Sequence, residues 1–161
     1  MSHDTSSVVP APRTLLRSAD AMRAMERTNR RVLGAIFAVV FAAVLGVAVW
    51  LSPDPAGHGT HTQLGFAPCA WMENYNTPCP TCGMTTAFSH AAHLHPVRAF
   101  LTQPAGFVLA VFTATAFWAS ALTAIFGWNL PMVFPWFFRL RMVVVGLVLI
   151  GLGWVYTLLT W

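Results

Sequence analysis

The sequence has no lysine and few charges of either sign. Nine arginines and five acidic residues make up its 9% charged content, against roughly 25% in a typical soluble domain. Hydrophobic residues account for 57% of its 161 positions. A soluble domain of this length cannot hide so much apolar surface from water. The composition therefore excludes an ordinary soluble protein and indicates a small, single-domain membrane protein.

Residues for several kinds of chemistry are also scarce. The long polar segment of the chain has only Asp54 and Glu73 as acids, so general acid–base catalysis is poorly supplied. No Gly-rich phosphate loop or Ser/His/Asp set is present, and the apolar runs lack the internal charges that mark ion pathways. Six arginines precede residue 32, which is an asymmetric tail suited to a membrane surface rather than a nucleic-acid-binding face. We expect a non-enzymatic protein with no nucleic-acid partner.

Three apolar runs predict three membrane-spanning helices. The first, Val32 to Leu51, lacks charge and proline and is long enough to cross about 30 Å of hydrocarbon. No segment alternates like a strand, so we predict an all-α integral membrane protein. The predicted segments are a basic tail with a juxtamembrane helix (1–31), a span (32–51), a loop containing cysteines, histidines and a short interfacial helix (52–103), a second span (104–128), a connection (129–141) and a third span (142–161).

The arginines also predict the orientation of the chain. The N-terminal tail and the connection with Arg139 and Arg141 are basic, whereas the cysteine-containing loop carries only Arg98. The positive-inside rule therefore places the N-terminus and the connection in the cytoplasm, and the loop and C-terminus outside it. The basic helix over residues 13–31 either lies in the membrane interface or is a solvated helix that sets topology.

Small residues recur every four positions along the predicted spans. Such stripes let another helix approach closely, either within this chain or from another membrane protein. We favour internal packing and expect the lipid bilayer as the main partner. The first span has one stripe, Gly34, Ala38, Ala42 and Gly46, and the second span has two: Gly106, Ala110 and Ala114, and Ala116, Ser120 and Ala124.

The loop holds every cysteine of the chain: Cys69, Cys79 and Cys82. Outside the cytoplasm thiols tend to be oxidised. Either Cys79 pairs with Cys82, or Cys69 pairs with one of them. In both cases one cysteine remains, which is typical of a reactive thiol, an intermolecular bridge or a metal site.

The first interpretation of these cysteines is thus a disulfide that fixes the loop, and a zinc site is the second. His90 and His93 follow them on a short helix predicted from about Met84 to Leu94, and three cysteines with one histidine can bind zinc tetrahedrally. Gly83 stands where c-type haem attachment needs histidine. We expect His58, His61 and His95 to be loop or structural residues.

A redox-active pair is the third interpretation. Pro80 makes the pair similar to the Cys-Pro-x-Cys of thioredoxin-like enzymes, in which a helix N-terminus lowers a thiol pKa. A thioredoxin fold is excluded because the loop has no strands. A membrane thiol oxidoreductase similar to the quinone-linked disulfide-forming enzymes would need a fourth span and a second cysteine pair.

The run from Cys79 to Ala87, Cys-Pro-Thr-Cys-Gly-Met-Thr-Thr-Ala, resembles the signature of an uncharacterised family of small bacterial membrane proteins. The family pattern is Cys-Pro-x-Cys-Gly-(Met/Leu)-Thr-Arg-Ala, with an earlier cysteine and a later Asn-Pro. The matching positions are Cys69, Cys79, Pro80, Cys82, Gly83, Met84, Thr85, Ala87 and Pro104. Thr86 and Gln103 depart from it, where the family has Arg and Asn. The resemblance implies the architecture of a small bacterial inner-membrane protein and no particular activity. From the residues themselves we expect a non-enzymatic protein whose loop is fixed by cysteine chemistry, and the small-residue stripes favour an accessory role.

Overall fold

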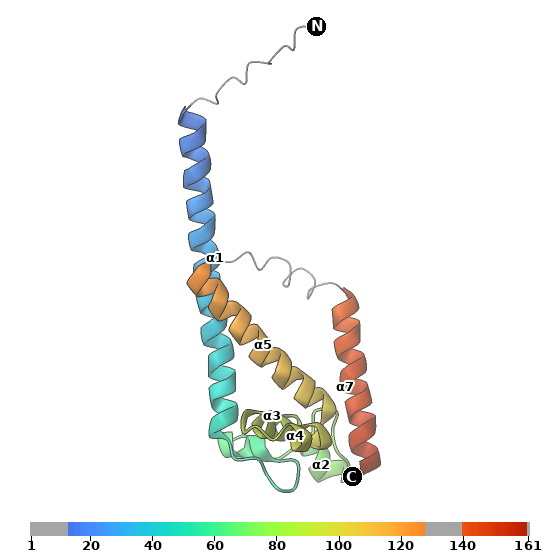
Figure 1. The fold of residues 1–161 in the computed structure, drawn as a ribbon. Helices are drawn as coiled ribbons and strands as arrows, with labels where there is room; N and C mark the ends of the chain where they lie inside the picture. The colour runs from blue at the N-terminus through green and yellow to red at the C-terminus, as the bar shows by residue number, and fades with distance from the viewer. Residues whose placement is uncertain (1–12, 128–139, 161) are drawn as a thin grey trace.

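The computed structural model describes residues 13–127 and 140–160. Every regular element in these two ranges is a helix, which confirms the predicted all-α class for this part of the chain. The elements are α1 (Arg13–Trp50), the 3-10 helix η1 (Thr60–Leu64), α2 (Ala70–Tyr75), α3 (Met84–Ala92), α4 (Pro96–Thr102), α5 (Pro104–Phe126) and α7 (Leu140–Thr160). Figure 1 shows the short helices gathered at one end of the three long ones.

Two of the long helices match predicted spans. α1 and α5 are long and apolar enough to cross a membrane, whereas the described apolar stretch of α7, Val144–Thr160, is shorter. Large apolar side chains are exposed along all three, such as Val39 at 69% and Leu147 at 63%. Because exposed apolar surface on this scale is unfavourable in water, these faces indicate a membrane setting.

α1 is longer than the span predicted within it. The basic segment before residue 32 and the apolar run after it form one uninterrupted helix, Arg13–Trp50. Arg30 and Glu26 form an i,i+4 ion pair of 2.9 Å within it. The basic half continues along the axis of α1 and extends past the end of α5 (Figure 1). The structure thus lacks the change of direction that a helix lying in the membrane interface needs.

The two candidate spans touch where their side chains are small. A Cβ on Gly34 would lie 2.9 Å from the backbone nitrogen of Ala124 and 3.0 Å from the carbonyl oxygen of Ser120. One turn earlier, Arg31 donates a 2.7 Å hydrogen bond to the carbonyl oxygen of Ile125. Gly46, at the other end of the same stripe, has no atom within 4 Å of such a Cβ. Internal packing therefore uses one end of the stripe and leaves the other open.

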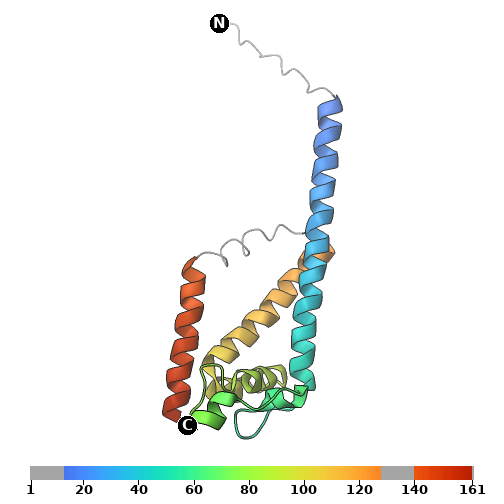
Figure 2. The same ribbon diagram turned by 180° about the vertical axis from the view of Figure 1, so that it is seen from behind.

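α7 meets the rest of the chain near the short helices and diverges from α5 away from them (Figures 1 and 2). Trp154 and Tyr156 donate hydrogen bonds to the carbonyl oxygens of Pro78, at 3.0 Å, and Leu101, at 2.9 Å. A Cβ on Gly153 would lie 3.1 Å from Ala105. The two aromatic residues thus attach α7 to the loop, and the Trp154 contact lies directly before Cys79.

Candidate metal centre

Buried hydroxyl groups fix the loop that carries the cysteines. Thr60 and Thr86 are 0% and 1% exposed, and their hydroxyl oxygens are 2.8 Å apart. Ser89 donates to the carbonyl oxygen of Leu51 at the end of α1. Thr86 therefore belongs to a buried pair of hydroxyls that joins α3 to η1 inside the loop.

The Cys79-Pro80-Thr81-Cys82 segment is a tight turn that leads into α3. The backbone nitrogen of Cys82 donates to the carbonyl oxygen of Cys79 at 3.0 Å, and proline suits the second position of such a turn. Gly83 then caps α3 with φ +79°. A Cβ on it would lie 2.9 Å from the carbonyl oxygen of Gly57. Both the dihedral angle and the close backbone require glycine here.

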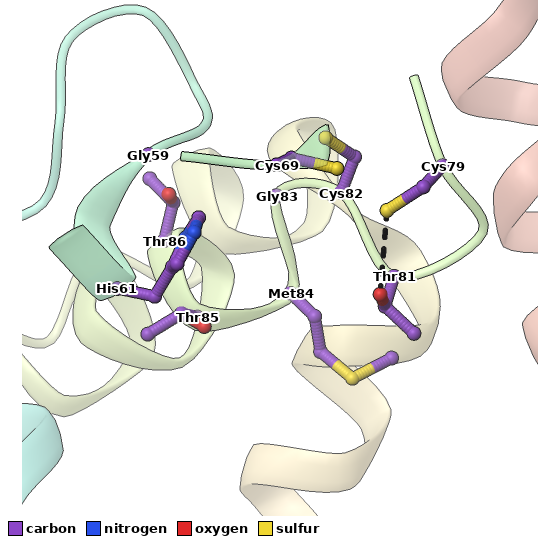
Figure 3. Close-up of a pocket in the computed structure, with 10 residues that line it drawn as sticks. All are labelled: Gly59, His61, Cys69, Cys79, Thr81, Cys82, Gly83, Met84, Thr85 and Thr86. Atoms are coloured by element: carbon purple, nitrogen blue, oxygen red, sulfur yellow. Dashed lines mark hydrogen bonds between the residues drawn. The ribbon is translucent and has the colours of Figure 1, made fainter. Parts of the chain in front are cut away.

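The three cysteine sulfurs meet at this turn. Cys69 is the N-cap of α2, and its Sγ lies within 4.8 Å of those of Cys79 and Cys82, which are within 4.8 Å of each other. All three are free thiols in the structure. Figure 3 shows Cys69 and Cys82 with their sulfurs adjacent and Cys79 beside them. Two separate segments of the loop thus converge on one cluster of sulfur atoms.

The environments of the turn's two thiols differ. Burial by itself raises the pKa of Cys79, but hydrogen bonding with the hydroxyl of Thr81, 3.4 Å away, and with its backbone lowers that pKa below the usual value. Burial, together with the negative charges of Cys79 and Cys69, raises the pKa of Cys82 to about 11. Three thiolates at this spacing repel one another, and a bound cation removes that repulsion.

The two histidines predicted as ligands lie elsewhere on α3. The group of possible ligand atoms formed by the described residues contains the three cysteines and neither His90 nor His93. Nδ1 of His93 lies 2.8 Å from the carbonyl oxygen of Ser89. His90 is six residues beyond Met84, the first residue of α3, which corresponds to a rise of about 9 Å along the helix. α3 therefore carries its histidines away from the sulfurs.

His90 belongs to a separate basic cluster. Its ring centroid lies 6.2 Å from that of His95 in an edge-on arrangement, and its Nδ1 is buried without a hydrogen-bond partner. Burial is the largest cause that lowers the pKa of His90. The positive charges of Arg98, His95 and His93 lower this pKa further. These surroundings favour a neutral imidazole.

A cavity of about 270 Å³ opens beside the sulfurs. The predicted motif residue Thr85 lines it together with the three cysteines, and so does His61, which sequence reasoning treated as a loop residue. A second residue that the sequence analysis missed is Met72, whose Sδ lies 3.8 Å from Sγ of Cys82. The sequence does contain a pattern that points to Met72, because Cys69 and Met72 have the same spacing as Cys79 and Cys82.

One comparison with known proteins matches the region that contains the cysteine cluster. Comparison with curated proteins and with solved structures finds no match. Residues 69–118, less than one third of the 161, match a family described as "Protein of unknown function (DUF2752)". The matched segment begins at Cys69, contains all three cysteines and ends within α5. The candidate metal centre therefore lies inside a segment that is similar to a family of unknown function.

Proposed function

We propose that this chain is a small integral membrane protein whose loop binds one metal ion, zinc or another thiophilic metal, through Cys69, Cys79 and Cys82. The observation that carries the proposal is the convergence of the three Sγ atoms within 4.8 Å of one another. Zn–S bonds of about 2.3 Å in a tetrahedron place sulfurs roughly 3.8 Å apart. Shifts on the order of 1 Å are enough to reach that geometry, and two of the ligands share one tight turn.

A metal uses this cluster more fully than a disulfide does. A disulfide joins two sulfurs at about 2.05 Å and leaves the third cysteine beside it. A thiolate next to a disulfide can attack it and exchange partners, so such a bond would fix the loop poorly. A metal bound by all three sulfurs holds the Cys69 segment and the Cys79–Cys82 turn together without a leftover thiol.

We place the site on the extracytoplasmic side of a bacterial inner membrane. Six arginines lie in the first half of α1, and Figure 1 shows that half at the opposite end of the molecule from α2, α3 and α4. Arg98 is the one arginine of the loop. The positive-inside rule then puts the N-terminus in the cytoplasm, with the loop and the C-terminus outside.

We infer an accessory role in this membrane rather than an enzymatic one. Gly46 on α1 and Gly146 and Gly151 on α7 have no atom within 4 Å of a Cβ placed on them. Small residues in open space allow close approach of a second membrane helix. Crosslinking in native membranes tests this role: adducts with a second protein or copy support it, and capture of monomer alone contradicts it.

Metal analysis of the purified protein tests the metal site. Protein purified in mild detergent without chelator is expected to contain about one thiophilic metal ion per chain, because each chain has one cluster of three cysteines. Removal of any one of these ligands should weaken metal binding. Cys79→Ser and Cys82→Ser are expected to lose the ion. His93→Asn is the matched control, since His93 lies on α3 outside the sulfur group, and it should retain the ion. Wild-type protein without metal, with two cysteines oxidised and one free, would contradict the proposal.

A thiol–disulfide oxidoreductase is the second candidate. The observation that favours it is the contrast between Cys79, which is half-buried with a lowered thiol pKa, and Cys82, which is 8% exposed. An accessible nucleophilic thiol with a buried resolving thiol is the arrangement that such exchange uses. Cys82→Ser should then trap mixed disulfides through Cys79, and absence of any trapped partner in cells would rule this function out.

A further inference from the structure

The sulfur cluster has a fourth member that is not a cysteine. Cys69 and Met72 are separated by two residues, as are Cys79 and Cys82. The N-cap position of Cys69 and the third position of Met72 in α2 bring both side chains to the first turn of that helix. Sδ of Met72 lies 3.8 Å from Sγ of Cys82. Each of the two converging segments therefore supplies a pair of sulfur atoms.

Other residues near the cluster are poorer candidates for a fourth ligand. His61 lines the cavity, but its Nε2 lies 3.3 Å from the carbonyl oxygen of Ala67, and Figure 3 shows its ring apart from the sulfurs. Met84 also lines the cavity, and its side chain runs away from the sulfurs in the same view (Figure 3). No described histidine or acidic side chain joins the three cysteines in the group of possible ligand atoms.

We propose that Met72 is the fourth ligand of this site and that the site takes Cu(I) in preference to Zn(II). This inference rests on the proposed metal site and adds the identity of the ion. A thioether is a neutral, polarisable donor that suits soft ions such as Cu(I), whereas zinc in proteins is bound by thiolate, imidazole and carboxylate. Within the described region the ligand atoms that converge are all sulfur.

The binding step changes no oxidation state. Each of the three thiols loses its proton to solvent when its sulfur bonds to the metal. Met72 has no proton to lose, and Cu(I) remains Cu(I). Oxygen must be excluded and a reductant supplied, so that neither the metal nor the thiols become oxidised.

Competition titrations on the full-length protein in detergent test the choice of metal. The reduced protein is titrated anaerobically with Cu(I), and separately with Zn(II), against a colorimetric chelator of known affinity. We expect Cu(I) to bind more tightly than Zn(II). Met72→Leu keeps the size of the side chain and removes the sulfur, and it should weaken Cu(I) binding at least about tenfold, since loss of even an outer-shell partner costs that much. Its Zn(II) affinity should stay unchanged.

Two further variants sharpen the result. Met84→Leu is the matched control and should change neither affinity, because it too removes a methionine sulfur, but one that lines the cavity and points away from the cysteine sulfurs (Figure 3). Met72→Cys completes a four-cysteine set and should raise Zn(II) affinity above that of the wild type. Circular dichroism confirms that each variant keeps its helices.

The possible outcomes separate this inference from the proposed function. Tight Zn(II) binding with no effect of Met72→Leu on either metal would overturn the role of Met72 and leave the three-cysteine site in place. A fully reduced wild-type protein that binds neither metal would overturn both.

Discussion

Gly83 gives the sharpest test of how the backbone builds the cysteine cluster. Its φ of +79° is unfavourable for any residue with a Cβ, and a Cβ there would lie 2.9 Å from the carbonyl oxygen of Gly57. The left-handed conformation costs about 1–2 kcal/mol for an L-residue. Overpacking against backbone that cannot rotate away costs a further ~1–3 kcal/mol. Gly83→Ala should therefore lower the free energy of unfolding by about 2–5 kcal/mol.

Gly65 provides a matched control for this substitution. Its φ is +83°, and a Cβ on it would meet nothing within 4 Å. Gly65→Ala should therefore cost only the conformational part, about 1–2 kcal/mol. The difference between the two variants isolates the contact with Gly57.

Equilibrium unfolding in detergent, followed by circular dichroism, measures both variants. Because Gly83 directly follows Cys82, we expect relief of the clash to shift the turn and separate the sulfurs. Gly83→Ala should thus also weaken metal binding, while Gly65→Ala leaves it unchanged. Equal destabilisation by the two substitutions, or unaltered metal affinity in Gly83→Ala, would refute this account of the turn.

Three other predictions follow from the packing of the chain. Gly34→Leu should destabilise the protein by about 1–3 kcal/mol because its Cβ would meet the backbone of α5, whereas Gly46→Leu, in open space, should not; similar unfolding curves would contradict this. Trp154→Phe removes the hydrogen bond to Pro78 and should lower the free energy of unfolding by about 1 kcal/mol. An unchanged free energy of unfolding would contradict the attachment of α7 at this point. The lowered pKa of His90 means that the folded state binds its proton more weakly than the unfolded state does, so stability should fall as pH drops below the ordinary value of 6.5. His90→Gln should reduce this acid sensitivity, and an identical pH profile would contradict it.

The sequence predicted those ends of the long helices that depend on nearby proline residues. The predicted first span ends near Pro53, and α1 ends at Trp50; the predicted second span begins at Pro104, and so does α5. The predicted segment boundary at residue 31 falls within α1. It marks a change from polar to apolar surroundings, and nothing in the backbone between Arg13 and Trp50 requires a break there.

The candidate site was predictable only in part. The positions of the cysteines in one loop follow from sequence, but their convergence depends on where α2 begins and on the turn at Gly83. That turn also directs α3, and so it decides that His90 lies away from the sulfurs. Met72 was passed over because methionine is usually an apolar packing residue. Its spacing from Cys69 repeats that of Cys79 and Cys82, but the 3.8 Å contact with Cys82 is what identifies it as a ligand candidate.

X-ray absorption at the edge of the bound metal tests the central claim most directly, because it counts the atoms around the ion. The account predicts three or four sulfur neighbours at about 2.3 Å, with fewer in Cys69→Ser. A metal surrounded by oxygen or nitrogen, or a protein in which two of the three cysteines form a disulfide and no metal is bound, would contradict it.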